Sequence, residues 1–375
     1  MNISILSKEA LLKALKVRDL SNPAEGDHAI QILIEKIHQT LEKAWNCNSH
    51  IYRESPIVSI EDNYDRLLYP ADGPARAARY TRYVCDNALL RTSTSAMIPR
   101  AMRKLSDKLQ GEDLILCPGL VYRRDQIDRL HLAEIHQMDV WRVTEKSMNS
   151  EDMREMIQLV LDAVLQDCEY RLEERVHPYT LDGLQIDVKY QGEWVEVGEC
   201  GLTHPEIHKD NLPNGDQLSG LAMGLGLDRI LMLRKGMKDV RLIASPNPRI
   251  SKQMKDLNPY QEVSYMPAVR RDLSLVLDIE TDVETLGDKV RESLGDESYL
   301  IESLEILNEH PYSKLPLHVQ EKLGLKEGQK NALVRVVLRS LHRSLTDEEC
   351  NLYRDKVYEC LHEGKYWEWA GKEDR

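Results

Sequence analysis

The sequence contains no phenylalanine, although its 375 residues include 16 tyrosines and 5 tryptophans. A globular chain of this length should contain on the order of a dozen phenylalanines, so chance does not explain their absence. Leucine, methionine, tyrosine and tryptophan can fill similar volumes in a core. The absence therefore excludes no fold, and it suggests that phenylalanine was selected against or removed by design.

Cysteine pairs and long apolar runs are also lacking. The seven cysteines are irregularly spaced and never form a C-x-x-C pair. This pattern predicts neither a disulfide framework nor a structural zinc site, and it favours a reducing cytoplasm. No run of about 18 apolar residues exists, so no membrane span is predicted. The first 20 residues resemble no signal peptide, and Glu9 and Asp19 argue against an Arg-rich transit peptide.

Positive charge is scarce, because the formal net charge is −13. General nucleic-acid binders gain affinity from Lys and Arg that displace counterions, so DNA is not an expected partner. A local basic face can still bind RNA on an acidic protein.

The length predicts two domains. Residues 246–267 contain four prolines and little periodicity, which indicates a linker between them. Before the linker, periodicity and turn residues predict helices at 27–45, 150–174 (capped by Ser150) and 218–233, an antiparallel strand pair at 114–124 and 135–144, and a hairpin at 184–190 and 193–198.

After the linker, the pattern predicts the order strand, helix, strand, strand, helix, which is that of a ferredoxin-like split βαβ unit. Capping boxes at Thr281–Glu284 and Thr346–Glu349 would open the two helices. The strands are expected at 272–279, 299–307 and 331–341. For a fourth strand, Tyr366–Trp369 is the only candidate.

Three short constellations suggest chemistry. The segment 121–128 places arginines where a strand ends, suited to a phosphate or a carboxylate, although a solvated strand end has the same composition. Gln137 and Asp139 lie on one face of a strand, where they could capture an ammonium or simply face water. The glycines of 224–226 permit close approach to a ligand that Arg229 could reach, or they pack helices.

Together and in order, these segments resemble class II aminoacyl-tRNA synthetases of the phenylalanyl type. VYRRDQID and HQMD resemble motif 2, and GLAMGLGLDRILMLRKGMKDVRL resembles motif 3. NYDRLLYPADGPAR and LLRTSTSAM resemble the segments before motif 2. MPAVRRDLSLVLD and LHRSLTDEECN resemble the ends of the anticodon-binding domain. The one-chain layout is similar to that of the organellar enzyme. The C-terminal sequence is similar to that of the last domain of the bacterial β-chain.

The resemblance implies an α+β fold. Residues 1–255 would form a class II synthetase catalytic domain with an antiparallel sheet, 256–264 a linker, and 265–375 a C-terminal ferredoxin-like split βαβ domain that binds the anticodon. The implied activity is ATP-dependent activation of phenylalanine, or a related aromatic amino acid, and its transfer to tRNA, with ATP and Mg²⁺ as cofactors. Expected partners are tRNA and the amino acid, with no membrane and no DNA, for a monomer or homodimer in the cytoplasm.

Two other functions stay open: adenylation of an aromatic amino acid for a non-translational acceptor, and tRNA binding by an inactive paralogue. The presence of Arg123 and Arg229 argues against the inactive paralogue. The anticodon-type domain argues against the non-translational acceptor.

The motif match also implies roles for individual residues. Arg123 would bridge the α-phosphate and the substrate carboxylate, and Arg229 would hold the ATP tail, with Gln137 as the third catalytic candidate. Further contacts to ATP are expected from Asp125, His131 and Glu196, the last also as a Mg²⁺ ligand. Contacts to the amino acid are expected from Ser93, Ser95, Gln137, Asp139, His177, Tyr179, Gly201 and Ala222. Contacts to tRNA are expected from Arg270, Arg271, Arg335, Arg339 and Arg343.

Three positions depart from the family's pattern. Ser93 stands where the family has His, Asp139 where it has Glu, and His177-Pro-Tyr179 where it has Phe-Pro-Phe. The pocket is therefore expected to be more polar than phenylalanine needs, which leaves room for a ring hydroxyl. An enzyme that supplies Phe-tRNA would also escape its own shortage by containing no phenylalanine, with deliberate engineering as the alternative.

Overall fold

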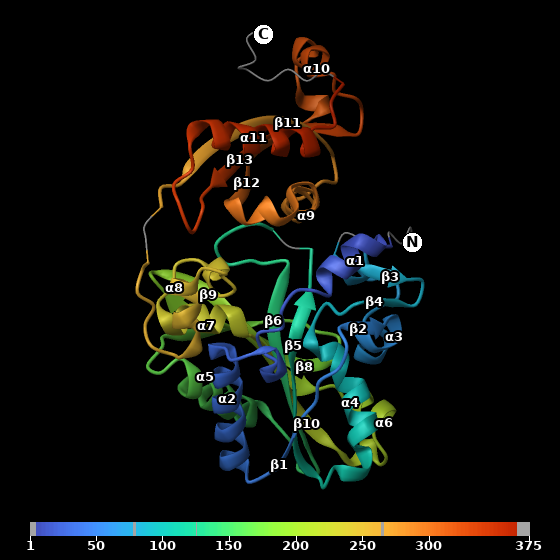
Figure 1. The fold of residues 1–375 in the computed structure, drawn as a ribbon. Helices are drawn as coiled ribbons and strands as arrows, with labels where there is room; N and C mark the ends of the chain where they lie inside the picture. Colours follow the sequence, from blue (N-terminus) through green and yellow to red (C-terminus); the bar gives the residue numbers. More distant parts are fainter. Residues whose placement is uncertain (1–4, 78–79, 125, 264–265, 366–375) are drawn as a thin grey trace. The chain divides into compact units, whose positions relative to one another are not determined.

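The computed structural model describes the chain except for residues 1–4, 78–79, 125, 264–265 and 366–375. The chain divides into two compact units (Figure 1). The first unit contains residues up to Arg123 and Glu134–Tyr260. The second contains Arg124–Ala133 and the residues from Gln261 onwards. Nothing in the sequence indicated that the loop 124–133 groups with the C-terminal part of the chain.

A seven-stranded sheet forms the centre of the first unit. Its strands, in spatial order, are β1 (Asn48–Ile51), β5 (Glu112–Tyr122), β6 (Glu134–Thr144), β10 (Ser219–Gly226), β9 (Glu193–Thr203), β8 (Thr180–Tyr190) and β7 (Tyr170–Glu174). All neighbours are antiparallel except β1 and β5. The strand pair and the hairpin predicted from the sequence are confirmed, and Gln191 and Gly192 make the hairpin turn with φ of 52° and 89°.

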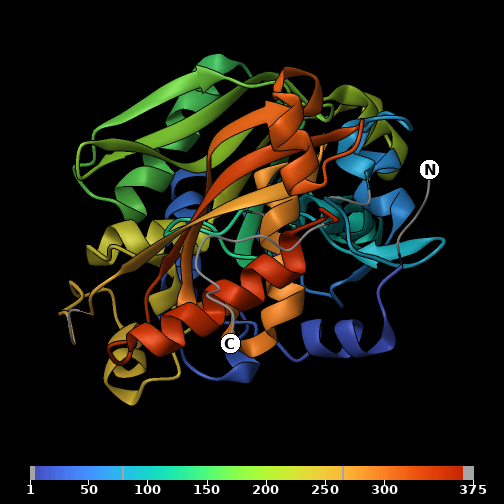
Figure 2. The same ribbon diagram turned by 90° about the horizontal axis from the view of Figure 1, so that it is seen from above.

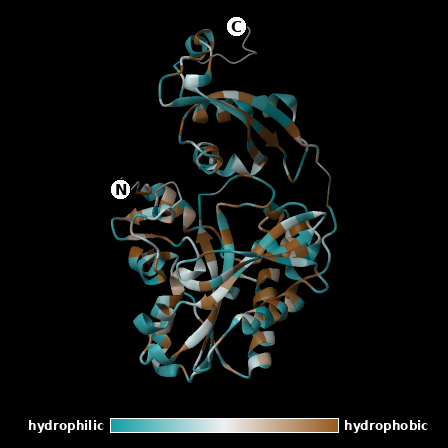
Figure 3. Ribbon diagram, turned by 180° about the vertical axis from the view of Figure 1, so that it is seen from behind, coloured by the Kyte–Doolittle hydropathy of each residue, from teal (hydrophilic) through white to brown (hydrophobic). Residues whose placement is uncertain are grey.

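Three helices pack on one face of this sheet: α2 (Ala29–Trp45), α5 (Ser150–Val164) and α7 (Leu227–Lys235). The other face carries α4 (Ile98–Leu105) and the 3-10 turn Thr94–Met97. Helix α2 forms where predicted, because its apolar residues recur every three or four positions and His28 caps its first turn. Apolar residues follow the central strands and the inner sides of the helices (Figure 3). Among the described residues, no helix has the length and apolar character that crossing a bilayer requires.

Smaller elements complete the first unit. They are α1 (Lys8–Ala14), α3 (Ile60–Asn63), α6 (Pro205–Asn211), α8 (Pro248–Ser251), and a three-stranded sheet of β2 (Ile57–Ser59), β4 (Ala88–Leu90) and β3 (Tyr83–Cys85).

Two helix predictions need correction. The helix expected at 218–233 begins only at Leu227, because the preceding residues alternate between large and small side chains and form strand β10. The helix expected at 150–174 ends at Val164, and β7 follows at Tyr170. Its N-cap is Asn149 rather than Ser150, in a capping box with Asp152.

The second unit has the element order expected from the sequence, with one added helix. Its elements are β11 (Val269–Asp278), α9 (Val283–Leu294), β12 (Ile301–Pro311), α10 (Leu317–Leu323), β13 (Gln329–Leu338) and α11 (Asp347–Leu361). The antiparallel sheet has the order β11-β13-β12, with α9 and α11 packed against it (Figure 2). Ile127, from the loop 124–133, belongs to the hydrophobic core of this unit.

The capping box at Thr346–Glu349 is confirmed, whereas Asp282 caps α9 in place of Thr281. The fourth strand proposed at Tyr366–Trp369 lies outside the described residues, so the ferredoxin-like assignment stays a prediction.

Candidate active site

One face of the sheet is bare along its middle strand. Strand β10 presents three small residues there, Ala222, Gly224 and Gly226, while the large residues between them are buried towards the helices. Those large residues are Leu221, Met223 and Leu225. Among the described residues, a Cβ at Gly224 would have one neighbour within 4 Å, Asp139 Oδ2 at 3.8 Å. A Cβ at Gly226 would likewise meet only the Val197 carbonyl oxygen, at 3.7 Å. The bare strip, Ala222 to Gly226, is therefore open above the sheet at its two glycines, whereas Ala222 is 2% exposed and belongs to a core cluster with Met97 and Trp141.

The side chains that border the bare strip come from the two neighbouring strands. Paired residues of antiparallel strands point to the same face, so the pairing register identifies the borders. From β6 and β9, the residues paired with the strip are Trp141 and Gly201 at Ala222, Asp139 and Glu199 at Gly224, and Gln137 at Gly226. Four of the residues expected to bind the amino acid thus meet in one place: Gln137, Asp139, Gly201 and Ala222.

Asp139 is almost fully buried at 2% exposure. Its Oδ2 accepts a hydrogen bond from Thr94 Oγ1 at 2.6 Å, and its Oδ1 accepts one from Trp141 Nε1 at 3.0 Å. Burial raises the pKa of Asp139, although these donors and Ser95 oppose the rise. The interaction with Ser95 places that predicted residue beside the strip. Ser93 is half-buried and lies at the N-cap of the 3-10 turn, and its role stays a prediction.

Glu199 faces Asp139 across the strip, and sequence reasoning missed it. His177 Nε2 lies 2.6 Å from Glu199 Oε2, and Arg175 Nε lies 3.4 Å from Oε1. Burial opposes ionisation of Glu199, but His177, Arg123 and Arg175 outweigh it and hold the pKa of this carboxyl below its ordinary value. A bulge in β9 after Glu196 puts both glutamates on this face, which an ideal strand alternation would not predict.

An aromatic cluster lies at the Ala222 end of the strip. The Tyr179 ring stacks on Trp141 with centroids 5.9 Å apart, and it also contacts Tyr69 and His177. Gly201 is required here, because a Cβ would come within 2.6 Å of Thr180 Cβ. Thr180 Oγ1 is buried and has no hydrogen-bond partner among the described residues.

Two arginines lie at the Gly226 end. Arg123 donates from Nε to the Thr92 carbonyl oxygen at 2.8 Å. Its charge opposes the rise in the pKa of Asp139 and Glu196 and helps to lower the pKa of Glu199. Arg229, in the first turn of α7, donates from Nη1 to the Glu196 carbonyl oxygen at 3.2 Å. Two cations at one end of an open strip suit a ligand with several negative charges.

Glu196, which was expected to bind Mg²⁺, lies beside Arg229. Its side chain is 41% exposed and lies 3.9 Å from Arg229 Nη1. Burial and the neighbouring Glu199 raise its pKa, and Arg229 and Arg123 oppose this. No group of three or more metal-binding side chains gathers in the part of the chain that the structure describes. One or two carboxylates fit Mg²⁺ that is otherwise held by phosphate oxygens and water.

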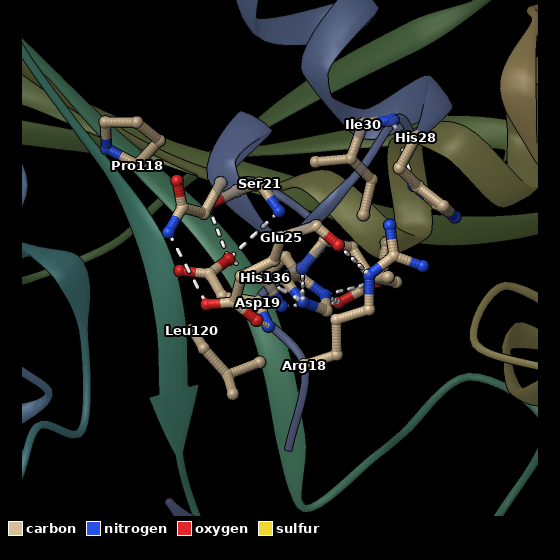
Figure 4. Close-up of polar contacts among 12 residues, drawn as sticks. Arg18, Asp19, Ser21, Glu25, His28, Ile30, Pro118, Leu120 and His136 are labelled. Carbon is tan, nitrogen blue, oxygen red and sulfur yellow. Dashed lines mark hydrogen bonds and ion pairs between the residues drawn. The ribbon is translucent and has the colours of Figure 1, made fainter. Parts of the chain in front are cut away.

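On the opposite face, a buried pair supports the strip. The backbone N–H of His136 donates to Asp228 Oδ2 at 2.5 Å, and its Nδ1 lies 3.0 Å from Asp228 Oδ1. The Leu20 N–H donates to His136 Nε2 at 3.0 Å. Figure 4 shows His136 beside Asp19, whose Oδ1 lies 4.0 Å from His136 Nε2. The His136–Asp228 pair fixes the start of β6, with Gln137, against the first turn of α7, with Arg229. No local pattern in the sequence indicates this pair, because its two residues are 92 positions apart.

Two other residues were expected to contact ATP, and neither is placed relative to the strip. His131 belongs to the second unit, where its Nδ1 lies 2.7 Å from Asp128 Oδ1. Asp125 lies outside the described residues. Their roles stay predictions.

Most of the arginines expected to bind tRNA are ion-paired. The pairs are Arg271–Asp347, Arg335–Asp272, Arg339–Glu302 and Arg343–Glu349. Arg270 is exposed on β11. Pairing cancels much of the positive charge, so the basic face is weaker than the sequence suggested.

Three relatives are similar over most of the chain. The phenylalanine–tRNA ligase of mitochondria from Dictyostelium discoideum is 25% identical, over 89% of this chain and 83% of the relative. The chloroplastic/mitochondrial phenylalanine–tRNA ligase of Arabidopsis thaliana is 29% identical, over 88% of this chain and 75% of the relative. The mitochondrial phenylalanine–tRNA ligase of Saccharomyces cerevisiae is 25% identical, over 92% of this chain and 88% of the relative.

These relatives contradict the cytoplasmic location that the cysteine pattern favoured. All three are named as mitochondrial or chloroplastic proteins, which points to an organelle. Unpaired cysteines are compatible with any reducing compartment, so the cysteine pattern does not distinguish the cytoplasm from an organelle.

The family model described as "tRNA synthetases class II core domain (F)" matches residues 15–254. That range includes the bare strip, both arginines at its end and all the side chains along its borders. The chain belongs to the family of class II tRNA synthetase core domains.

Proposed function

We propose that this chain is a single-chain phenylalanine–tRNA ligase, which activates phenylalanine or a closely related aromatic amino acid with ATP and transfers it to tRNA. The observation that carries the proposal is the bare strip, with an aromatic cluster at one end and two arginines at the other. An aromatic amino acid has its ring and its carboxylate at opposite ends, and ATP supplies the polyanion. The names of the three relatives support the same activity.

In activation, the amino acid carboxylate attacks the α-phosphate of ATP, so two anions must approach each other. Arg123 and Arg229 offset this repulsion, and their charges stabilise the transition state most when they are already in place. The bonds of Arg123 to Thr92 and of Arg229 to Glu196 provide that preorganisation. Bound Mg²⁺ would neutralise part of the phosphate charge, with Glu196 as its protein ligand.

The amino acid itself would lie along the strip. Its ring would pack against Trp141 and Tyr179, over the small side chain of Ala222. Its ammonium would lie near Asp139, with Gln137 towards the carboxylate end. The hydroxyl of Thr180, which has no hydrogen-bond partner among the described residues, would accept a hydrogen bond from a ring hydroxyl at this end or donate one to it. Meta-tyrosine and tyrosine are therefore included as candidate substrates.

Transfer to tRNA would use the second unit. Arg270 is exposed there, and the paired arginines could exchange their carboxylates for phosphates. This part of the proposal rests on the relatives more than on charge.

The test is pyrophosphate exchange with all standard amino acids and meta-tyrosine, followed by charging of organellar and total tRNA. Phenylalanine-dependent exchange together with charging supports the proposal. Exchange without charging of any tRNA favours a non-translational acceptor, and absence of exchange favours an inactive paralogue. A preference for phenylalanine of tenfold or more over both hydroxylated rings would show that Thr180 does not select a hydroxyl.

A further inference from the structure

Two carboxylates face each other across the bare strip at Gly224. Asp139 pairs with Gly224 from β6, and Glu199 pairs with it from β9. Neighbouring strands are about 5 Å apart, so the two acidic residues are separated by roughly 10 Å at their Cα atoms. Because Gly224 has no side chain, the space between the carboxylates has a backbone floor. Apart from Gly224 and its two chain neighbours, Asp139 Oδ2 is the only described atom within 4 Å of the Cβ position there.

The two carboxylates differ in what they already bind. Asp139 accepts hydrogen bonds from Thr94 and Trp141, one at each oxygen, and burial disfavours its charge. Glu199 is more exposed, at 27%, and its partner His177 occupies Oε2 at 2.6 Å. The remaining contact, from the exposed Arg175 to Oε1, is longer at 3.4 Å. Glu199 is therefore the better of the two for receiving a further cation.

We propose that Glu199, oriented by His177, binds the α-ammonium of the amino acid over Gly224, with Asp139 as its second acceptor. The inference rests on the proposed function and adds to it a residue that selects the substrate. An ammonium has three donors and makes short bonds to carboxylates, so it can bridge both sides of the strip. A substrate without the ammonium would leave two buried or half-buried acids facing each other, which disfavours its binding.

Two other roles for Glu199 make different predictions. As a second Mg²⁺ ligand beside Glu196, it would act on ATP and metal rather than on the amino acid. As a structural anchor for the loop that carries His177, it would act on all aromatic ligands alike. Ligands that contain only one end of the amino acid distinguish these roles.

The test uses two such ligands on the full-length chain. 2-Phenylethylamine keeps the ammonium and lacks the carboxylate, and 3-phenylpropionate does the reverse. Their dissociation constants are measured by calorimetry for the unaltered protein, for Glu199→Gln, and for the control Glu173→Gln, which removes an exposed β7 carboxylate paired with Arg171. Loss of a charge-assisted hydrogen bond is expected to weaken binding of the amine about tenfold or more.

We expect Glu199→Gln to raise the dissociation constant of 2-phenylethylamine at least tenfold and that of 3-phenylpropionate less than twofold. The control variant should bind both ligands as the unaltered protein does. In pyrophosphate exchange the KM for phenylalanine should rise while that for ATP and the Mg²⁺ requirement stay the same. Equal weakening of both ligands, or a rise confined to ATP and Mg²⁺, overturns the proposal.

If Glu199→Gln does not fold, His177→Gln replaces it. This variant keeps the charge of Glu199 and removes the imidazole ring that orients it. For the proposal to stand, it must weaken binding of 2-phenylethylamine more than binding of 3-phenylpropionate. If the unaltered protein activates phenylalanine and amine binding is indifferent to both variants, this inference fails alone. If the unaltered protein activates no aromatic amino acid, the proposed function fails first.

Discussion

Gly224→Ala adds one methyl group to the middle of the bare strip, and the structure separates its effect on folding from its effect on binding. The backbone of Gly224 is not in the left-handed region, so alanine fits it without strain. The new Cβ would make an ordinary contact with Asp139 Oδ2 at 3.8 Å. Gly→Ala at a compatible position stabilises a protein by about 0.4–1 kcal/mol, so the variant should unfold at the same temperature or slightly higher.

Binding should respond in the opposite direction. The methyl group stands where we place the substrate ammonium, between Asp139 and Glu199. Loss of one hydrogen bond to a charged group costs about 1.5–3 kcal/mol, which corresponds to roughly a 10- to 150-fold decrease in kcat/KM for the amino acid. The KM for ATP should change little, because the arginines lie at the Gly226 end of the strip and the methyl group stands over its middle.

The assay is pyrophosphate exchange at varied phenylalanine and ATP, with thermal unfolding of the same preparations. Gly198→Ala is the matched control, since its Cβ would lie 2.5 Å from the Gly224 carbonyl oxygen and must displace backbone. It should lower the unfolding temperature, as overpacking costs about 1–3 kcal/mol. An unchanged kcat/KM for phenylalanine in folded Gly224→Ala would refute the placement of the ammonium.

Three further predictions follow from other parts of the molecule. Arg229→Ala should slow adenylate formation by about 10²–10³-fold, since it removes a preorganised charge worth roughly 3 kcal/mol, and a normal rate in single-turnover assays would contradict its role. Burial lowers the pKa of His28 to about 4 in the folded protein, against an ordinary value of 6.5. The unfolded chain therefore binds a proton at this residue first, and the free energy of unfolding decreases as the pH falls from 6.5 to 4. The variant His28→Asn keeps a capping side chain on α2 that does not titrate. Between pH 6.5 and 4, its free energy of unfolding should therefore fall by about 3 kcal/mol less than that of the unaltered protein. Equal losses in the two proteins would show that His28 is not responsible. Finally, if the absence of phenylalanine reflects scarcity of Phe-tRNA, synthesis of this protein should continue in phenylalanine-starved cells while proteins with phenylalanine stall, as pulse labelling would measure.

Local sequence signals predicted those parts of the fold that depend on neighbouring residues. The cap of α11 at Thr346 and the hairpin turn at Gln191–Gly192 are examples, because the interacting groups are within a few positions of each other. The sequence of strand β10 predicts a helix as readily as a strand, because its glycines and leucines suit both spacings when the partner strands are unknown. Only the register with β6 and β9 shows that the small residues share one face.

Some residues of the candidate site could likewise be predicted from the sequence, and others could not. The motifs supplied Arg123, Arg229 and Asp139, and the structure places them around one strip. Glu199 required knowledge of a bulge, which changes which residues share a face and has no clear sequence mark. The His136–Asp228 pair joins residues 92 positions apart, so no local sequence pattern predicts it.

The loop 124–133 has a consequence for how this protein can be divided or inherited. Ile127 is buried among the apolar residues of the second unit, its carbonyl accepts from the Leu304 N–H at 2.8 Å, and Arg124 pairs with Asp288 at 3.1 Å. The polypeptide therefore passes from one unit to the other three times: after Arg123, after Ala133 and after Tyr260. One crossover in the gene near codon 260 would separate the loop from the residues it is fitted to. A recombinant that exchanges the C-terminal part with a relative should work only when the ten codons of the loop are exchanged with it, so these two stretches are expected to evolve as one heritable piece.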